Sequence, residues 1–472
     1  MRKSRIKSEP FYSVDAAWLR IDVPTNMAII TGVMIFDEPL DLERLKATIE
    51  SRLLCYERFR QRVREKNGFG GSLSWELDPN FDLDAHLQRT TLPPPGGLPG
   101  LQALAGRLMG TPLERDKPLW QINYIADLDG SSALVVRLHH CIADGLALVQ
   151  VLLSLADESP DAAWPEPPEE PDTSESTLFG KLILPPLRLT NGALKLSGRI
   201  LRGGLNLLDD PWYVKNIAKD GMANAAALGK LLLISPDRKT LFRGECWVEK
   251  RVTWSEPVSL EVIKAIGKTF DGTVNDVILA AMSGALRRYL EYRGEEVDFL
   301  DLRAVVPVSI RSPEEFGELG NRFGLIFLPL PVGLKDPVAR LAILKQRMDA
   351  IKDSREAVVA FGILTAAGFS PRQVESIIVN IFGKKGTAVM TNVPGPRKLL
   401  YLAGKPLRRI MFWVPQPGGL GLGISILSYN GEVLVGVATD AGLIPDPEEI
   451  VRGFNEEVQY LRERVSALTD SG

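Results

Sequence analysis

The sequence predicts an α/β protein made of two α/β sandwich domains. In both halves of the chain, short apolar runs rich in β-favouring residues alternate with longer stretches of helical periodicity. Mixed sheets with helices on their faces are the stable way to bury such elements. Between the halves, residues 157–175 contain eight acidic residues, five prolines and no lysine or arginine. This composition cannot build a core, so it predicts an exposed linker.

The periodicity places the elements in order along each half. The first half is expected to hold a strand at 27–36, helices at 40–54 and 101–109, strands at 120–126 and 133–140, and a helix at 146–156. The second half is expected to hold helices at 274–292 and 337–352 and strands at 303–308, 325–330, 388–391 and 423–428. We therefore expect an N-terminal domain at 1–156, a connecting region at 157–240 and a C-terminal domain at 241–472.

Composition and charge exclude several classes of protein. With 45% hydrophobic and 24% charged residues, the chain is typical of a globular protein. Its net charge of −3 does not favour nucleic acid as a partner. Three widely spaced cysteines, Cys55, Cys141 and Cys246, exclude a disulfide framework and a clustered metal site. The basic N-terminus lacks the apolar stretch of a secretory signal, and apolar runs are too short to span a bilayer, so a cytoplasmic protein is expected.

The most informative segment is HHCIADG at 139–145, which contains two of the three histidines in 472 residues. Because strand side chains alternate, His140 should share a face with Leu134, Val136 and Leu138, whereas His139 should point to the other side. An imidazole on an apolar face stays neutral, and neutral imidazole is the form that acts as a general base at pH 7. His140 is therefore the first candidate for chemistry.

Two other residues of the segment have expected roles. Asp144 precedes a predicted helix, so it can cap that helix and can also orient the neighbouring groups. Gly145 is expected to form a tight turn where a side chain would crowd the pocket. Cys141 could be a nucleophile, but a small buried thiol is the more common role and no set of residues to activate it is evident.

The segment is similar to the HHxxxDG motif of the CoA-dependent acyltransferases, which include chloramphenicol acetyltransferase and peptide-synthetase condensation domains. Further segments resemble motifs of one branch, the bacterial wax ester synthase/diacylglycerol acyltransferases; they are Pro118-Leu119-Trp120, Asn275-Asp276, Gly320-Asn321-Arg322-Phe323-Gly324 and Thr391-Asn392-Val393-Pro394-Gly395-Pro396. The resemblance runs from Ser13 to the last strands. It implies two chloramphenicol-acetyltransferase-like domains with an active-site tunnel between them. The chain departs from the family at two positions. One is Cys141, which follows the two histidines, and the other is Ala85, where the family often has tyrosine.

The resemblance implies acyl transfer from a long-chain acyl-CoA to a fatty alcohol or to diacylglycerol, with His140 as the base. Thr391 or Asn392 is the expected donor to the oxyanion, although a purely structural turn is the alternative. Asn275 and Asp276 either cap a helix or shape the site from the second domain. Arg60 is the expected partner of Asp144, with Arg58 and Arg62 as alternatives. No metal and no cofactor are implied, because acyl-CoA is a co-substrate.

Two other functions remain open. One is a related acyltransferase acting on a different alcohol or amine, and the other is a non-catalytic lipid-binding homologue that keeps the fold. Residues 181–202 carry five basic residues, no acidic ones and several aliphatic ones. This pattern predicts either a helix lying on an anionic membrane or lipid-droplet surface, or a connector packed on the protein.

Overall fold

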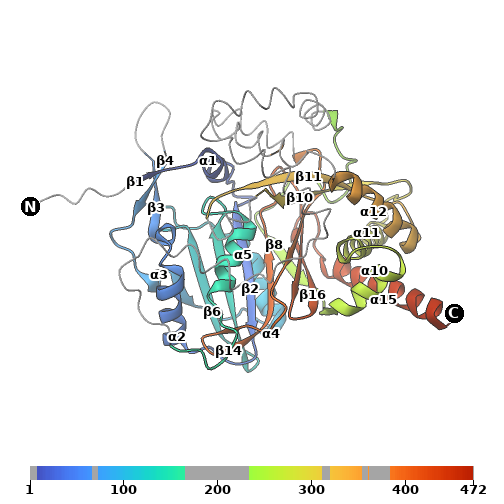
Figure 1. Cartoon of the computed structure of the whole chain (residues 1–472). Coiled ribbons are helices and arrows are strands. Elements are labelled where there is room, and N and C mark those ends of the chain that lie inside the picture. Colours follow the sequence, from blue (N-terminus) through green and yellow to red (C-terminus); the bar gives the residue numbers. More distant parts are fainter. Residues whose placement is uncertain are drawn as a thin grey trace, which may run out of the picture.

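The computed structural model describes residues 8–65, 73–164, 233–310, 319–352, 360 and 383–470 (Figure 1). These residues form two large mixed sheets that carry helices, as the sequence predicts. Segment 181–202 and most of the acidic linker lie outside the described residues.

The first sheet has six strands in the order β13-β14-β2-β7-β6-β5. Four of them come from the first half of the chain, namely β2 (Ile29–Phe36), β5 (Leu87–Arg89), β6 (Trp120–Leu128) and β7 (Ser131–His139). Alternate residues of β7 enter different cores. Leu134, Val136 and Leu138 pack in the core that includes helix α5 (Gly145–Ser154), whereas Val135 packs in a core shared with the second sheet. The predicted alternation is therefore confirmed.

Two strands of this sheet come from the far end of the chain. Strand β14 (Lys405–Trp413) pairs with β2, and β13 (Tyr401–Leu402) pairs with β14, both antiparallel. Two strands from the predicted C-terminal domain at 241–472 thus complete the sheet of the first half. The two sheets therefore do not correspond to the two halves of the sequence. Pairing between such distant segments has no local sequence pattern, because it depends on the assembled fold.

The second sheet has the order β11-β10-β12-β15-β16-β8, with β9 paired to β16. Its strands are β8 (Lys250–Trp254), β9 (Val258–Ser259), β10 (Leu302–Ser309), β11 (Phe323–Leu330), β12 (Ala388–Pro394), β15 (Leu422–Tyr429) and β16 (Glu432–Asp440). Strand β12 is parallel to both of its neighbours. A continuous core lies between this sheet and its helices, which are α10 (Leu260–Thr269), α11 (Val274–Tyr292), α12 (Pro337–Lys352) and α15 (Glu448–Asp470).

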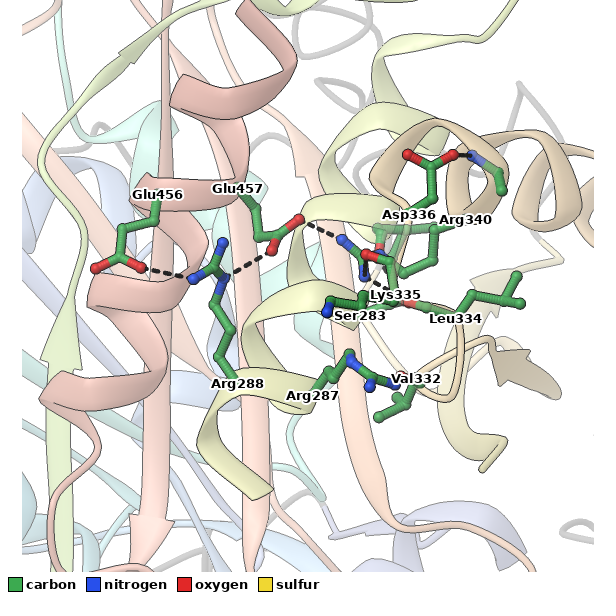
Figure 2. Close-up of polar contacts among 12 residues, drawn as sticks. Ser283, Arg287, Arg288, Val332, Leu334, Lys335, Asp336, Arg340, Glu456 and Glu457 are labelled. Atoms are coloured by element: carbon green, nitrogen blue, oxygen red, sulfur yellow. Dashed lines mark hydrogen bonds and ion pairs between the residues drawn. The ribbon is translucent and has the colours of Figure 1, made fainter. Parts of the chain in front are cut away.

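Buried charges join three of these helices (Figure 2). Arg340 of α12 is 1% exposed and pairs with Glu457 of α15, and the other carboxylate oxygen of Glu457 accepts a hydrogen bond from Arg288 of α11 at 2.7 Å. Gly284 of α11 leaves room for the pair, because a Cβ there would lie 2.4 Å from the carboxyl carbon of Glu457. An unpaired buried charge is costly, so the pair constrains how the three helices pack.

The remaining elements of the first half surround its sheet. They are α1 (Ser13–Arg20), α2 (Leu42–Thr48), the π-helix η1 (Ile49–Leu53), the 3₁₀ helix η2 (Glu57–Arg60), α3 (Leu83–His86), α4 (Gly97–Met109), and a small sheet of β1 (Ser8–Pro10), β4 (Leu73–Leu77) and β3 (Gln61–Glu65). The helix predicted at 40–54 is thus α2 continued by η1. Helix α4 packs against β8 of the second sheet, and a Cβ on its Gly106 would lie 2.4 Å from the Lys250 carbonyl oxygen. This close approach joins the two halves.

Candidate active site

The two adjacent histidines lie where strand β7 ends. The backbone N–H of His139 donates to the carbonyl of Leu119 at 2.9 Å, and that of His140 donates to the carbonyl of Ala28 at 2.8 Å. Leu119 belongs to the Pro-Leu-Trp segment that leads into β6, and Ala28 precedes β2. The strands on both sides of β7 therefore fix the backbone of the pair, and both side chains are buried.

His139 contacts a carboxylate on the face away from the apolar core. Its Nε2 lies 3.4 Å from the carboxylate of Asp22, and the same group accepts hydrogen bonds from Arg115 at 3.1 Å and from the backbone of Ala28 at 2.6 Å. Burial raises the pKa of Asp22. The close contact with His139 and the electrostatic attraction from that residue act in the opposite direction, and the pKa of Asp22 is lowered overall. His139 thus connects the motif to the segment that follows α1.

The imidazole of His140 is enclosed by aromatic rings. Trp18 of α1 stacks on it, with ring centroids 4.0 Å apart and ring planes at 21°, and Phe323 of β11 lies 5.6 Å away between centroids. Burial lowers the pKa of His140 to about 4, although the charge of Asp144 and the carbonyl of His140 itself act in the opposite direction. The imidazole is therefore neutral at pH 7, as the sequence predicts.

Asp144 has both of the roles expected of it, capping and orientation. Its side chain accepts a hydrogen bond from the backbone N–H of Ala147 at 2.9 Å and so caps α5. It also accepts one from the backbone N–H of Arg322 at 3.0 Å, while its own N–H donates to the carbonyl of Gly320 at 3.1 Å. The motif of the first half is thereby fastened to the segment 320–322 of the second half.

Backbone N–H groups of Ala147 and Arg322 donate hydrogen bonds to Asp144, and such groups satisfy a carboxylate without a second buried charge. Arg60 ends η2. Of the two alternative arginines, Arg58 pairs with Glu9 at 3.6 Å and Arg62 lies 3.9 Å from Glu76. The pairing of Asp144 with an arginine therefore stays a prediction.

Asn321 links the two halves directly at the histidine. Its side-chain amide donates to the carboxylate of Asp15 in α1 and to the backbone carbonyl of His140, each at 2.8 Å. Both Asn321 and Asp15 are buried, at 6% and 1% exposure. Since both contacts lie in the interior, the amide holds three chain segments in a fixed relation.

Gly145 is needed for space and not for a turn. It is the first residue of α5, and a Cβ there would lie 3.2 Å from a methyl group of Val414. A side chain at this position would therefore be crowded, as the sequence predicts. Gly145 begins a helix, however, and does not form the predicted tight turn. Gly145 and His140 both line the cavity described below.

The predicted residues of the second half come together at the end of β12. The side-chain amide of Asn392 donates a hydrogen bond to the side-chain oxygen of Asn275, so these two motifs meet. Asp276 is buried in a capping box with Thr273, which is the capping role. The hydroxyl of Thr391 is buried and has no hydrogen-bond partner among the described residues.

A cavity of about 600 Å³ lies between the halves, with His140 and Thr391 in its wall. Its lining is mainly apolar and comes from elements that include α1, α5, β10, β11, β12, β14 and the segment after β14. It includes Ala17, Trp18, Val149, Leu153, Val305, Leu325, Phe327, Val389, Phe412 and Leu420. Polar groups in the wall include Asn392 and Ser309, and the cations Lys264 and Arg397 also line it. A mainly apolar cavity with a few polar groups suits a substrate with an aliphatic chain.

Sequence reasoning assigned no role to Trp18, Asp15 or Asn321. Asp15 and Trp18 are three residues apart and therefore on one face of α1, and this spacing was the available indication. It could not reveal that the face meets His140. Asn321 lies in a quoted motif, but its partners come from segments distant in sequence.

The fold and the position of the two histidines beside a cavity between the halves agree with the acyltransferase class that the sequence resembles. The sequence model of the wax ester synthase/diacylglycerol acyltransferase catalytic domain matches residues 11–278, and that of the C-terminal domain matches residues 319–462. The chain therefore belongs to the wax ester synthase/diacylglycerol acyltransferase family and is an O-acyltransferase.

Named relatives agree with this assignment, and solved structures share the fold. A protein of Mycobacterium tuberculosis strain H37Rv, named as a probable diacylglycerol O-acyltransferase, is 29% identical over 460 residues, which cover 95% of each chain. The solved wax ester synthase/diacylglycerol acyltransferase of Marinobacter aquaeolei VT8 has a TM-score of 0.69 at 20% identity and covers 97% of this chain and 100% of its own. The starter condensation domain of rhizomide synthetase, with C8-CoA, has a TM-score of 0.60 at 12% identity, covering 97% and 94%.

Among the helices of the described residues, none has both the length and the apolar character needed to cross a membrane.

Proposed function

We propose that this enzyme transfers the acyl group of a long-chain acyl-CoA to the free hydroxyl of a diacylglycerol or of a fatty alcohol. The observation that carries the proposal is the pair formed by His140 and Thr391, which come from opposite halves and line one apolar cavity. The names of the Mycobacterium relatives favour diacylglycerol as the first acceptor to test.

In the proposed reaction, His140 acts as a general base. The neutral imidazole takes the proton of the acceptor hydroxyl while the hydroxyl oxygen attacks the thioester carbonyl carbon. The carbon–sulfur bond of the tetrahedral intermediate then breaks, and the imidazolium returns the proton to the departing CoA thiolate. An ester and free CoA result, with no acyl-enzyme. A positioned base of this kind contributes about 10² to 10⁴ in rate.

Thr391 is the proposed donor to the oxyanion of that intermediate. Its hydroxyl is buried, lines the cavity and has no hydrogen-bond partner among the described residues. An unused donor in an apolar site is well placed to stabilise developing negative charge, and removing such a donor costs about 10² to 10³ in rate. Asn392 is already bonded to Asn275, so we assign it to holding the strand end beside Thr391.

The acceptors proposed here are insoluble lipids, so the enzyme must meet them at a membrane or lipid-droplet surface. Peripheral attachment is therefore part of the proposal. Segment 181–202, with its five basic residues, is the proposed contact.

The test is an assay of purified protein with palmitoyl-CoA and, in parallel, dioleoylglycerol, hexadecanol and water. We expect CoA release and ester formation with at least one of the two alcohols and little release with water. His140→Ala should abolish ester formation while the protein stays folded by thermal unfolding.

The adjacent His139→Ala is the matched control. It should lower the unfolding temperature, because Asp22 loses a buried partner, and it should retain turnover within about tenfold. Full turnover in folded His140→Ala protein, or CoA release with water alone, would contradict the proposed function.

A further inference from the structure

Helix α1 is linked to His140 by one direct contact and by one contact through Asn321. Trp18 covers one face of the imidazole at 4.0 Å between ring centroids. One turn earlier on the same face, Asp15 accepts a hydrogen bond from Asn321, whose amide also donates to the carbonyl of His140. The reaction proposed above uses neither contact.

We propose that helix α1 is a positioning element for the catalytic base, in which Trp18 stabilises the imidazolium form of His140 while Asp15 and Asn321 fix its backbone carbonyl. This inference rests on the proposed function, because it gives α1 a role only if His140 takes a proton. Trp18 and Asp15 are positioning residues, since both act through His140.

The stacking contact has an electrostatic consequence. The face of an indole ring carries partial negative charge and attracts a cation, and tryptophan does so more strongly than phenylalanine. The His140 ring is neutral before proton transfer and positive after it. The attraction is therefore stronger in the transition state than in the ground state, which is the condition for an effect on kcat.

The surroundings of His140 otherwise disfavour its charged form. Burial is the largest effect on its pKa and lowers it, and the charge of His139 acts in the same direction, while Asp144 opposes both. Charged groups on the elements packed around the ring also include Asp15 on α1, held by Asn321, Arg20 at the end of α1, and Arg322, whose backbone binds Asp144. In an apolar enclosure where the Asp144 carboxylate is the charge that favours the imidazolium, an indole face is a substantial further stabilising contact.

Asn321 controls the second contact. The His140 carbonyl belongs to the residue that carries the imidazole, so fixing this carbonyl also fixes the backbone from which the ring projects. The Asn321 amide donates to that carbonyl, and the Asp15 carboxylate holds the amide at 2.8 Å. Because Asn321 belongs to the second half and α1 to the first, this contact also joins the base to both halves.

The experiment compares Trp18→Leu with Trp18→Phe in the palmitoyl-CoA assay. Leucine keeps an apolar side chain but has no π face, whereas phenylalanine keeps a weaker one. We expect Trp18→Leu to lower kcat about tenfold, with KM for palmitoyl-CoA changed by less than about twofold, and Trp18→Phe to retain most of kcat. The acid limb of the pH profile of kcat/KM should move to lower pH in Trp18→Leu, because the imidazolium is less stable. Trp164→Leu, at a side chain 53% exposed, is the control for loss of a tryptophan and should not change kcat.

Asp15 provides a second pair in case the Trp18 variants fold poorly. Asp15→Asn keeps an oxygen that can accept from Asn321, whereas Asp15→Leu removes it. We expect the asparagine variant to keep most of kcat and the leucine variant to lose about tenfold or more. Unchanged kcat in both leucine variants, equal losses in Trp18→Leu and Trp18→Phe, or a change confined to KM would overturn the proposal. Turnover by His140→Ala would instead overturn the proposed function, so the two failures are distinguishable.

Discussion

At the scale of single residues, the adjacent histidines have different surroundings. His139 contacts a carboxylate, whereas His140 stacks on an aromatic ring. The Asp22 carboxylate lies beside His139 at 3.4 Å. Trp18 and Phe323 enclose His140, and burial holds its pKa at about 4. A base with so low a pKa is available over a wide range of pH, because it stays neutral until the solution becomes strongly acidic.

This environment predicts an unusual pH dependence. An ordinary histidine base would lose activity below its pKa of about 6.5. Burial disfavours the charged form of His140, so protonation and the loss of activity should move down toward about pH 4. We expect kcat/KM to stay level from about pH 8 to about pH 5.5 and to fall below that. The measurement is kcat/KM against pH, with thermal unfolding at each pH to separate loss of the base from loss of the fold. A midpoint near 6.5 in folded enzyme would show that the ring is not desolvated.

Cys141 supports a second prediction at this scale. The thiol is completely buried, and burial raises its pKa well above the ordinary value, so the reactive thiolate is suppressed. We expect Cys141→Ala to keep at least about a third of wild-type turnover and intact-protein mass spectrometry to show no acyl adduct after incubation with palmitoyl-CoA. An adduct on wild type that disappears in Cys141→Ala would replace direct transfer by a covalent mechanism.

The sequence predicted the residues whose roles depend on local structure. The end of a strand placed His140, and the start of a helix placed Asp144 at a cap. The Arg60 pairing and the stacking of Trp18 depend on which distant segments meet. A carboxylate can be satisfied by guanidinium or by backbone N–H groups, and the sequence does not distinguish these partners.

At the scale of elements, periodicity predicted some of the long helices and buried strands, whereas helix α15 and strand β16 were not predicted. Helices α11 and α12 span the residues expected for them, and strands β7 and β10 differ by one or two residues at each end. The π-helical turn η1 and strand β14 were not predicted. The first is a local change of hydrogen bonding within an otherwise regular apolar pattern, and the second depends on pairing with β2 from the other half.

Helix α4 gives a prediction about the contact between the halves. Glycine to alanine inside a helix normally stabilises it by about 1 kcal/mol. At Gly106, however, the added Cβ would lie 2.4 Å from the backbone oxygen of Lys250 in β8, which cannot move as a side chain could. We expect Gly106→Ala to lower the free energy of unfolding by about 1 to 3 kcal/mol, measured by urea denaturation.

The control for this prediction is Ala103→Gly at an exposed position of the same helix. It should cost about 1 kcal/mol, which would confirm that α4 follows ordinary helix propensity where there is space. If Gly106→Ala were more stable than wild type while the control behaved as expected, α4 would not pack as closely on β8 as described here.

At the scale of the whole molecule, the site exists only when the two halves are together. The first half supplies His140 and Asp144, and the second supplies Thr391 together with the Asn321 amide and the Arg322 backbone that hold the motif. The crossover of β13 and β14 into the first sheet makes the halves interdependent. Neither half should therefore be active by itself, since each contributes to the cavity wall.

The proposed attachment to lipid belongs to the scale of the whole molecule, and we expect charge to control it. The chain has a net charge of −3, yet residues 181–202 carry five basic residues and no acidic ones. Each basic residue near an anionic surface contributes roughly 1 kcal/mol, which salt screens. We expect replacement of the five by glutamine to reduce flotation with anionic liposomes at low salt and to spare turnover of a short soluble alcohol; they are Lys181, Arg188, Lys195, Arg199 and Arg202.

The control for this prediction changes the net charge by the same amount on surfaces of the described residues. It replaces five exposed basic side chains by glutamine, namely Arg238, Lys239, Lys268, Lys335 and Arg408. If attraction depends on the local segment, the control should float like wild type, because fixed charges act over only about 8 to 10 Å at moderate ionic strength. If both variants lose flotation equally, total charge governs attachment. If neither loses it and salt has no effect, the enzyme must reach its lipid substrates through an uncharged surface.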